Sequence, residues 1–369
     1  MPPLPENIDQ ILAAVKSELS GTAFSCEELI PLSGGNANYV FCAKLASPLE
    51  GGISQVLIKH GEGYLSGNTS FQLPTSRCAI ESKSLASLGG LSPAGDGWFS
   101  VRTPKLYHFN PERNTQIQEY LPNGVDLKSY ALKHFEPHTS LTKKVQCVEL
   151  GRALGRWLRH FHEWAGRSSE FRRNAAENTA LQRLKHSTYY DYLVQMVDKF
   201  PDVLSKERGV FESVKVMSER EIEDDSVLQP VHADFWTGNV LLPDAAIEGP
   251  VGTSVFVVDW EVTSLGVRVR DVGQMMAELY MLQLFKQIDA GGWMVEGLLA
   301  GYGKLSEDEA FRIAIHVGCH LIVIGGTVPG WGSSEHVDRV VAVGRDMIVN
   351  GWARNKGSFE GTVLGNMFL

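Results

Sequence analysis

The residues best suited to chemistry lie in two short segments of the second half of the chain. The first contains a carboxylate, Asp234, and five residues later a carboxamide, Asn239. The second contains two more carboxylates, Asp259 and Glu261. Carboxylate and amide oxygens are ligands that suit Mg²⁺, and a further carboxylate beside such an ion can accept a proton from a hydroxyl group. The pattern therefore indicates a site for a magnesium-bound nucleotide.

The chain between these two segments reads as a β-hairpin. Apolar runs at residues 240–242 and 255–258 flank residues 243–250, which are rich in turn-forming Pro, Gly and Asp. Two apolar runs around such a loop favour a hairpin. In an antiparallel pair the start of the first strand lies beside the end of the second. We therefore expect Asn239 and Asp259 to lie close together.

The motif His-x-Asp-x-x-x-x-Asn at residues 232–239, followed by Asp259, resembles the catalytic and metal-binding motifs of protein-kinase-like phosphotransferases. The chain has no Arg directly before Asp234, and Asp259 opens Asp-Trp-Glu rather than the Asp-Phe-Gly of protein kinases. In these two features the chain is similar to the aminoglycoside phosphotransferase and choline kinase superfamily, especially its methylthioribose-kinase-like branch. Ala233 departs from the Gly that is common in that branch.

Within this superfamily the chain most closely resembles the fungal hydroxytryptamine kinases. The shared segments are spread thinly over most of the chain, at residues 32–35, 58–60, 233–239 and 259–261. The resemblance implies an α+β, protein-kinase-like fold with two lobes. A small N-terminal nucleotide-binding lobe, residues 1–121, would contain an antiparallel β-sheet and one helix. A larger, mostly helical C-terminal lobe, residues 122–369, would contain the catalytic loop, the metal site and the acceptor pocket.

The resemblance also implies a role for each residue of the two segments. Asp234 would be the catalytic base, which orients the acceptor hydroxyl and takes its proton late in the transfer. The alternative for Asp234 is a structural turn residue, but the His-x-Asp-x-x-x-x-Asn spacing, the flanking strands and Asp259 favour the catalytic role. Asn239 and Asp259 would bind Mg²⁺. Glu261 lies one strand period beyond Asp259 and is therefore expected to point to the same side. It would bind a second ion or a metal-bound water, or have only a structural role, so one or two ions remain open.

The loop around these residues needs support. His232 is expected to be a packed, hydrogen-bonded residue that braces the loop, rather than a proton carrier. A helix is expected to begin at Asp271, because Asp is a favoured N-cap, and the same carboxylate would anchor the catalytic loop. For Arg268 and Arg270, we expect structural salt bridges rather than contacts with an anionic substrate group or phosphate.

Small residues between two predicted strands, 28–32 and 39–45, form a candidate phosphate-binding turn in the N-terminal third of the chain. By itself, a Gly-Gly pair between strands is usually only a hairpin turn. The candidate cofactor-binding residues of the turn are Ser33, Gly34, Gly35 and Asn38.

Lys59 ends the next predicted strand, and Glu81 lies on a predicted helix that stops at Gly89. Taken alone, both residues read as solvated surface charges. By the resemblance, Lys59 would neutralise the α- and β-phosphates of ATP, and Glu81 would be its ion-pair partner.

Residues 119–124 interrupt all regular structure, after strands expected at 105–109 and 115–119. The resemblance makes this segment the hinge, where the backbone carbonyl of Glu119 and the N–H group of Leu121 would face adenine. Without the resemblance it reads only as a domain linker.

Composition excludes several classes of protein. Of 369 residues, 43% are hydrophobic and 21% charged, which indicates a globular chain long enough for two domains. A net charge of −9 argues against a nucleic-acid partner. The five cysteines are scattered, which suggests neither a disulfide framework nor a zinc site. Residues 1–10 do not resemble a signal peptide, and the apolar stretch 313–324 is predicted to be too short to span a bilayer. We expect a soluble cytoplasmic protein without a membrane partner.

The acceptor is the least determined feature. Trp236, Trp260 and Trp331 are candidate walls of an acceptor pocket, and Glu335 is a candidate ammonium partner. We rank a small neutral or mono-cationic alcohol or phenol first, methylthioribose-like sugars second and aminoglycosides third. The alternative function is a non-catalytic kinase-like module that binds nucleotide. Against this alternative stands the presence of the complete expected set, Lys59, Glu81, Asp234, Asn239 and Asp259. The sequence does not predict an oligomeric state.

Overall fold

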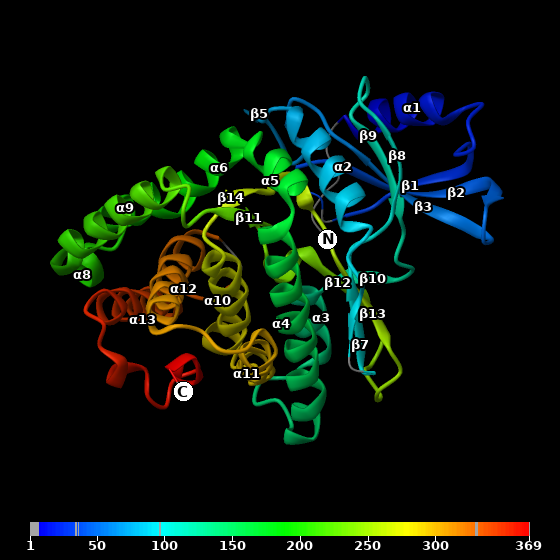
Figure 1. Ribbon diagram of the computed structural model, residues 1–369. Coiled ribbons are helices and arrows are strands. Elements are labelled where there is room, and N and C mark those ends of the chain that lie inside the picture. Colours follow the sequence, from blue (N-terminus) through cyan, green and yellow to red (C-terminus); the bar gives the residue numbers. More distant parts are fainter. Residues whose placement is uncertain (1–6, 34, 36, 96, 329–330, 369) are drawn as a thin grey trace. The chain divides into compact units, whose positions relative to one another are not determined.

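The computed structural model describes residues 7–33, 35, 37–95, 97–328 and 331–368 (Figure 1). The chain forms two compact units, residues 1–90 with 103–122 and residues 91–102 with 123–369. The last of the three divisions along the chain, between residues 122 and 123, falls inside the segment 119–124 that interrupts regular structure. Residues 91–102 join the second unit because β7 (Phe99–Arg102) pairs in parallel with β13 (Thr253–Val257).

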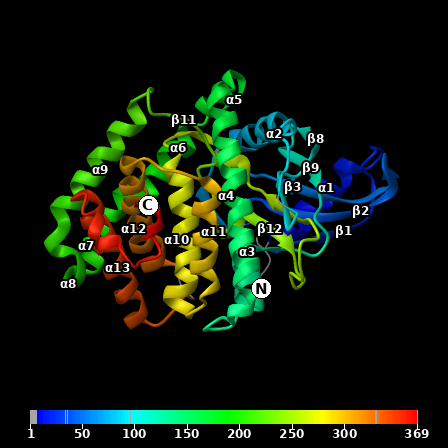
Figure 2. The ribbon, with the colours of Figure 1, turned by 60° about the horizontal axis from the view of Figure 1, so that its bottom comes forward.

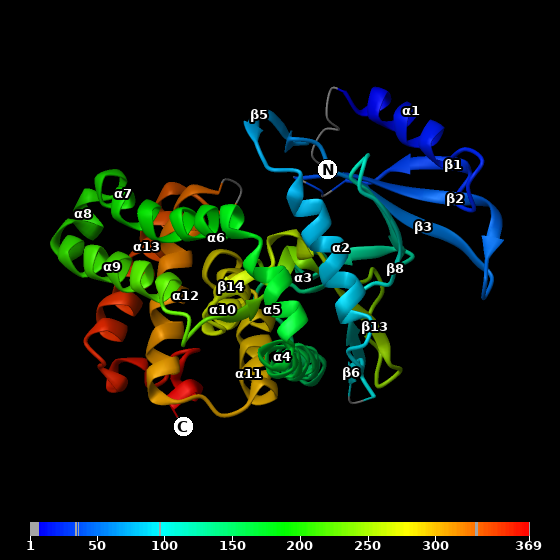
Figure 3. The ribbon, with the colours of Figure 1, turned by 45° about the horizontal axis from the view of Figure 1, so that its top comes forward.

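The first unit is built on a five-stranded antiparallel sheet in the order β1-β2-β3-β9-β8. Helix α1 packs beside β1, and its apolar stripe of Ile11, Val15 and Leu19 enters the core (Figure 3). The elements of this unit are α1 (Ile8–Leu19), β1 (Cys26–Pro31), β2 (Tyr39–Leu49), β3 (Ile53–His60), β4 (Tyr64–Leu65), β5 (Asn68–Gln72), α2 (Ser76–Leu88), β8 (Leu106–Asn110) and β9 (Thr115–Glu119).

The second unit contains another five-stranded sheet, in the order β10-β12-β13-β7-β6. Its strands are β6 (Ala94–Gly95), β7, β10 (Gly124–Asp126), β12 (Val240–Pro243) and β13. The hairpin expected from the sequence is confirmed, because β12 and β13 pair in antiparallel fashion with Val240 opposite Val257. A short pair, β11 (Gln229–Val231) and β14 (Ser264–Gly266), flanks the segments that carry the candidate chemistry.

Helices make up most of the second unit, as the sequence predicts. Helices α4, α10, α11 and α12 run side by side (Figure 2), and α10 is buried on nearly every face. A turn of π-helix, η2 (Ser187–Asp191), joins α6 to α7. The helices are α3 (Leu127–His134), α4 (Lys144–Arg167), α5 (Ser169–Ala176), α6 (Thr179–His186), α7 (Tyr192–Lys199), α8 (Pro201–Leu204), α9 (Arg208–Glu223), α10 (Val269–Lys286), α11 (Ala290–Tyr302), α12 (Glu307–Thr327) and α13 (Ser334–Trp352).

Helix α12 corrects one expectation. The apolar stretch is longer than the sequence suggested, and the 21-residue helix is long and apolar enough to cross a membrane by length and composition. The expectation that it is too short was therefore wrong. Within the structure, however, 89% of its most apolar window is buried against other parts of the protein. Burial of this kind is what a core helix of a globular domain shows.

Glycines allow α4 and α11 to pack with their backbones in close contact. A Cβ atom added at Gly151 would lie 2.0 Å from a backbone oxygen of α11, and one at Gly297 would lie 2.0 Å from a backbone oxygen of α4. The same two helices carry His162 and Tyr302, whose side chains are joined by a 2.9 Å hydrogen bond. The close packing thus fixes His162, which contacts the candidate site described below.

We expect Gly297→Ala to lower the free energy of unfolding by roughly 2 kcal/mol or more, because the added methyl group forces the two helix backbones apart. The control is Gly209→Ala on α9, where an added Cβ meets nothing within 4 Å. That change should leave stability unchanged or raise it by up to about 1 kcal/mol. Urea unfolding of both variants measures the difference. Similar midpoints for the two variants would contradict this account of the helix packing.

Candidate active site

A buried carboxylate, Asp271, holds the backbone of the loop that carries Asp234. Its two oxygens accept hydrogen bonds from the backbone N–H groups of His232 and Ala233, both at 2.9 Å. The ring of His162 lies 3.0 Å from the same carboxylate, and both side chains are fully buried. Burial alone would raise the pKa of Asp271, but the hydrogen bond and charge of His162, with further help from His232, lower it overall.

The predicted anchoring role of Asp271 is thus confirmed, whereas its predicted role as N-cap is wrong. Helix α10 begins at Val269, its N-cap is Arg268, and Asp271 lies in the first turn. A negative charge is favourable there as well, because the first turn exposes backbone N–H groups. The side chain is directed to the loop instead of capping its own helix.

His232 braces the loop in the way expected. Its side chain is fully buried, its Nδ1 accepts the backbone N–H of Asp234 at 3.2 Å, and its Nε2 lies 3.0 Å from the carbonyl oxygen of Val258. Because Nδ1 accepts, Nε2 carries the proton and donates. The ring therefore ties the loop to the chain directly before Asp259.

Two non-glycine residues of the site have left-handed backbone conformations. Ala233 has φ 64° and Asp259 has φ 69°. Glycine adopts this region without steric cost, which gives a physical reason for the Gly expected in place of Ala233. Asp tolerates it better than most residues, because its short polar side chain can hydrogen-bond locally. Backbone strain of this kind is concentrated at functional sites.

Asp234 is held by three donors. Lys185 Nζ lies 2.6 Å from Oδ1, and Gln274 Nε2 donates to the same oxygen at 2.9 Å. Asn239 Nδ2 donates to the backbone oxygen of Asp234 at 2.9 Å and, more weakly, to Oδ2 at 3.3 Å. Burial would raise the pKa of Asp234, but the charge and hydrogen bond of Lys185 and the hydrogen bond of Gln274 hold it below its ordinary value. The carboxylate is therefore ionised at neutral pH.

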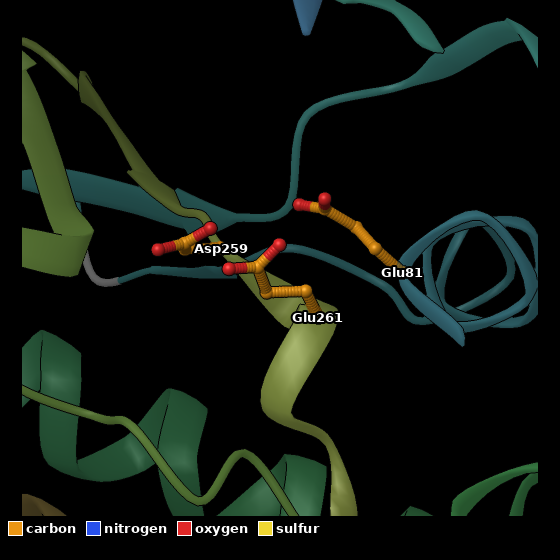
Figure 4. Close-up of side chains that lie close together, drawn as sticks. All are labelled: Glu81, Asp259 and Glu261. Carbon is orange, nitrogen blue, oxygen red and sulfur yellow. The ribbon is translucent and has the colours of Figure 1, made fainter. Parts of the chain in front are cut away.

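The hairpin brings the proposed metal ligands together, as expected. Val258 N–H donates to the backbone oxygen of Asn239 at 3.0 Å, so Asn239 lies beside the chain that leads into Asp259. Carboxylate oxygens of Asp259 and Glu261 lie within 4.8 Å of each other, and the two side chains stand side by side in Figure 4. The donor set of two carboxylates and an amide oxygen fits a hard divalent cation such as Mg²⁺.

The reason given for the placement of Glu261 was wrong, although the placement itself is found. Asp259 is not followed by a strand but by a turn of 3₁₀-helix, η5 (Trp260–Val262). The left-handed conformation of Asp259 turns the chain, so alternation along a strand does not apply.

In the first unit, the expected ion pair between Lys59 and Glu81 is confirmed. The Lys59 ammonium lies 2.8 Å from the Glu81 carboxylate, and their side chains are only 8% and 1% exposed. Gln116 Nε2 donates to the same carboxylate at 3.0 Å. Because both charges are desolvated, the simpler reading of two solvated surface charges is excluded. Figure 4 shows Glu81 on α2.

The candidate phosphate-binding turn is described at Ser33, Gly35 and Asn38, whereas Gly34 lies outside the described residues. Asn38 is buried, and its Oδ1 accepts a 3.0 Å hydrogen bond from Arg77 Nη2. Ser66 Oγ donates to the backbone oxygens of Gly35 and Asn38, both at 3.1 Å. In this structure the Asn38 side chain therefore supports the turn.

Arg77 was missed by sequence reasoning. It is fully buried and also bonds the backbone oxygens of Ala37, Glu62 and Pro74. Its position one helical turn before Glu81 was the available signal, but position alone cannot distinguish an inward-facing arginine from a solvated one.

The hinge residues lie at the end of a strand. Glu119 is the last residue of β9; its N–H donates to the backbone oxygen of Lys105 at 2.8 Å, and its carboxylate accepts from Lys105 N–H at 3.1 Å. Leu121 follows outside the sheet and is half-buried. Their expected contacts with adenine stay a prediction.

The three candidate tryptophans of the acceptor pocket differ in how far they are buried. Trp260 is fully buried, and its Nε1 donates to the carbonyl oxygen of Val257, so it is a core residue and its predicted place in a pocket wall is wrong. Trp331 is also buried, stacked on Phe285 with Lys128 Nζ 3.8 Å above its ring. Trp236 is half-buried and Glu335 is exposed.

A buried polar network links the catalytic loop to the surrounding helices, and the sequence reading missed it. Thr237 Oγ1 donates to Glu278 at 3.0 Å, and His320 Nε2 lies 3.0 Å from the other Glu278 oxygen. Tyr189 of η2 completes the chain, with its hydroxyl 3.1 Å from His320 Nδ1. A signal was present, since Gln274 and Glu278 are polar residues one turn apart in an otherwise apolar stretch of α10.

A cavity of about 590 Å³ lies elsewhere in the second unit, among residues of α9, α12 and α13. Within the described parts of the chain, its lining includes Arg268 and Arg312 but none of the predicted site residues. Arg268 forms an ion pair with Glu309, as expected for a structural salt bridge.

Comparison with known proteins finds related phosphotransferases. Residues 85–310 match the model of the phosphotransferase enzyme family. Phosphotransferase FrzJ from Cladobotryum sp. is 28% identical over 98% of this chain and 97% of its own length. A 4-hydroxytryptamine kinase from Psilocybe cubensis is 23% identical over 82% of each chain.

Solved structures show the same fold. A choline/ethanolamine kinase family protein from Mesorhizobium loti has a TM-score of 0.51 at 16% identity, covering 93% of this chain and 98% of its own. A choline kinase from Cryptosporidium parvum has a TM-score of 0.50 at 12% identity, covering 98% of each chain. At these identities the likeness establishes the fold alone. The expected α+β, protein-kinase-like fold is thus confirmed.

We expect Asp271→Asn to lower the free energy of unfolding by about 2–4 kcal/mol. The carboxamide has a single oxygen, so one of the two backbone N–H groups loses its acceptor, and the negative charge is removed. Asp225→Asn, at a side chain that is 87% exposed, is the control and should change stability by less than about 0.5 kcal/mol. Urea unfolding at neutral pH provides the measurement, and an unchanged midpoint for Asp271→Asn would refute the anchoring role.

The effect should also depend on pH. Since folding lowers the pKa of Asp271, its stabilisation is fully present above the unfolded pKa of about 3.9 and is lost as pH falls through the folded pKa. The difference between the wild type and Asp271→Asn should therefore shrink in strong acid.

Proposed function

The chain belongs to the phosphotransferase enzyme family, and we propose that it is an ATP- and Mg²⁺-dependent kinase that phosphorylates a hydroxyl group of a small molecule. The observation that carries this proposal is the arrangement of Asp234. It is an ionised carboxylate, held by Lys185 and Gln274 through one oxygen and linked to Asn239. The names of the relatives, a phosphotransferase and a 4-hydroxytryptamine kinase, support a small acceptor.

Asp234 has the properties that the transfer requires. Oδ1 is engaged by Lys185 and Gln274, whereas among the described residues Oδ2 has only the weak 3.3 Å contact with Asn239. We assign to Oδ2 the acceptor hydroxyl, whose proton passes to it as the oxygen attacks the γ-phosphorus and the bond to the leaving phosphate oxygen breaks. A weakly basic carboxylate suffices, because a loose transition state requires little prior deprotonation.

We assign the metal to Asn239, Asp259 and Glu261. Mg²⁺ at these oxygens would neutralise negative charge on the nucleotide phosphates. The chain contributes the rigidity of the site. His232 fixes the approach to Asp259, and Asp271 fixes the loop before Asn239.

We assign the nucleotide to the first unit, and the support for this is the desolvated pair of Lys59 and Glu81. Glu81 holds the ammonium, and Gln116 holds the Glu81 carboxylate, before any phosphate arrives. The turn at Ser33, Gly34, Gly35 and Asn38 would contact the phosphates, and the backbone of Glu119 and Leu121 would contact adenine. The proposal also places the protein in the cytoplasm, where its five free thiols would remain reduced.

The first test of the function is Asp234→Asn, which keeps the size and one oxygen that can accept from Lys185 and Gln274 but removes the charge. With ATP and an acceptor panel of methylthioribose, choline, kanamycin and hydroxyindoles, we expect kcat to fall by roughly 10²–10⁴ while nucleotide affinity is retained. Asp244→Asn, at a hairpin carboxylate paired with Lys133 and His134, is the control and should keep normal turnover. Normal turnover by Asp234→Asn would refute the catalytic assignment.

The second test concerns the metal. Asp259→Asn suits the left-handed backbone at this position and removes only the charge, so folding should be preserved. We expect Mg²⁺ to lose its ability to strengthen ATP binding, because one neutral amide replaces a charged ligand. Calorimetric titration with ATP, with and without Mg²⁺, measures the effect. An equal gain in affinity from Mg²⁺ in wild type and variant would remove Asp259 from the metal site.

A further inference from the structure

Lys185 is a positive charge in direct contact with the proposed catalytic base. Its Nζ lies 2.6 Å from Asp234 Oδ1, and the two side chains are only 16% and 20% exposed. A pair withdrawn from water in this way interacts far more strongly than a surface pair. The carboxylate beside the acceptor hydroxyl is thus largely neutralised by the protein itself.

The position of Lys185 is fixed by the helix that carries it and by a neighbouring aromatic ring. It is the penultimate residue of α6, directly before the π-helical turn η2. Such turns are rare and frequently mark functional sites. The Lys185 ammonium lies 5.5 Å from the ring centroid of Tyr189, which is fully buried and fixed by His320. The Lys185 side chain is therefore restrained, unlike that of a lysine on the open surface.

Two described side chains of α10 near Asp234 and Lys185 add no free negative charge. Glu278 is the nearby carboxylate of α10, and it is already engaged by Thr237 and His320. Gln274, which also bonds Asp234, is neutral. With Asp259 and Glu261 assigned to the metal, a cationic group attached close to the reacting hydroxyl would meet the Lys185 ammonium, and neither of these two side chains of α10 offsets the repulsion.

We propose that Lys185 is a specificity-determining residue of the acceptor site, which selects hydroxyl groups that have no cationic centre next to them. The inference rests on the proposed kinase function and narrows its acceptor class to neutral alcohols or phenols, and to molecules whose amine lies far from the hydroxyl. The same ammonium is suitably placed to stabilise negative charge on the phosphoryl group as it reaches the hydroxyl held by Asp234.

The test uses three small probe alcohols of similar size: ethylene glycol, ethanolamine, which is cationic at neutral pH, and glycolate, which is anionic. Each is supplied at high concentration with γ-labelled ATP and Mg²⁺, and the label is followed into phosphorylated probe and inorganic phosphate. We expect the wild type to transfer to ethylene glycol at least 10-fold more than to ethanolamine. Lys185→Met should reduce or invert this ratio by 10-fold or more, and Lys185→Arg should restore it.

The controls separate specificity from folding and from the proposed function. Lys199→Met removes an exposed lysine of the second unit, whose ammonium donates to the Gly326 carbonyl, and should leave the ratio unchanged. A purely structural role for Lys185 would lower the melting temperature and all transfer rates together, without changing the ratio, and would overturn the proposal.

Label released only as phosphate, with the same rate in wild type and Lys185→Met, would also overturn it. Failure of the kinase function itself would look different, since the wild type would then consume no ATP with any probe or with water.

Discussion

The candidate active site depends on one buried carboxylate. Asp271 binds two consecutive backbone N–H groups of the catalytic loop, and His162 binds the same carboxylate from α4. A buried charge of this kind is tolerated only because every oxygen is hydrogen-bonded. The arrangement fixes the left-handed conformation of Ala233, and through it the position of Asp234. The close packing of α4 on α11 serves the same end, because it holds His162 against Tyr302.

Desolvated charge pairs recur wherever chemistry is proposed. Lys59 and Glu81 form one in the first unit, and Asp234 and Lys185 form another in the second. Such pairs add little to stability, because desolvation offsets much of their attraction. Their advantage is preorganisation, since a fixed charge does not have to reorient when phosphoryl oxygens arrive. This explains why two costly pairs stand beside the residues assigned to nucleotide and acceptor.

Much of the fold could be predicted, because local patterns of apolar and turn-forming residues indicate its elements. The hairpin before Asp259 follows from turn residues between apolar runs, and several strands of the first part were predicted from the sequence. The mostly helical second part was implied by the family resemblance. Prediction failed where local rules were overridden. Asp271 is not an N-cap, because its oxygens accept hydrogen bonds from the catalytic loop instead. Glu261 does not follow a strand, because the chain turns at Asp259. Trp260 is core because aromatic neighbours surround it.

The sequence by itself determined which groups can bind a metal and take a proton, because Asp234, Asn239 and Asp259 are brought together by one hairpin and its loops. It also indicated the pair of Lys59 and Glu81, since a strand end and a helix supply opposite charges. Only the tertiary structure decided what neutralises Asp234. Lys185 and Gln274 are 49 and 40 residues away in sequence, and they meet it because of how η2 and α10 pack. Contacts of that range depend on the packing of whole elements, which no local spacing encodes.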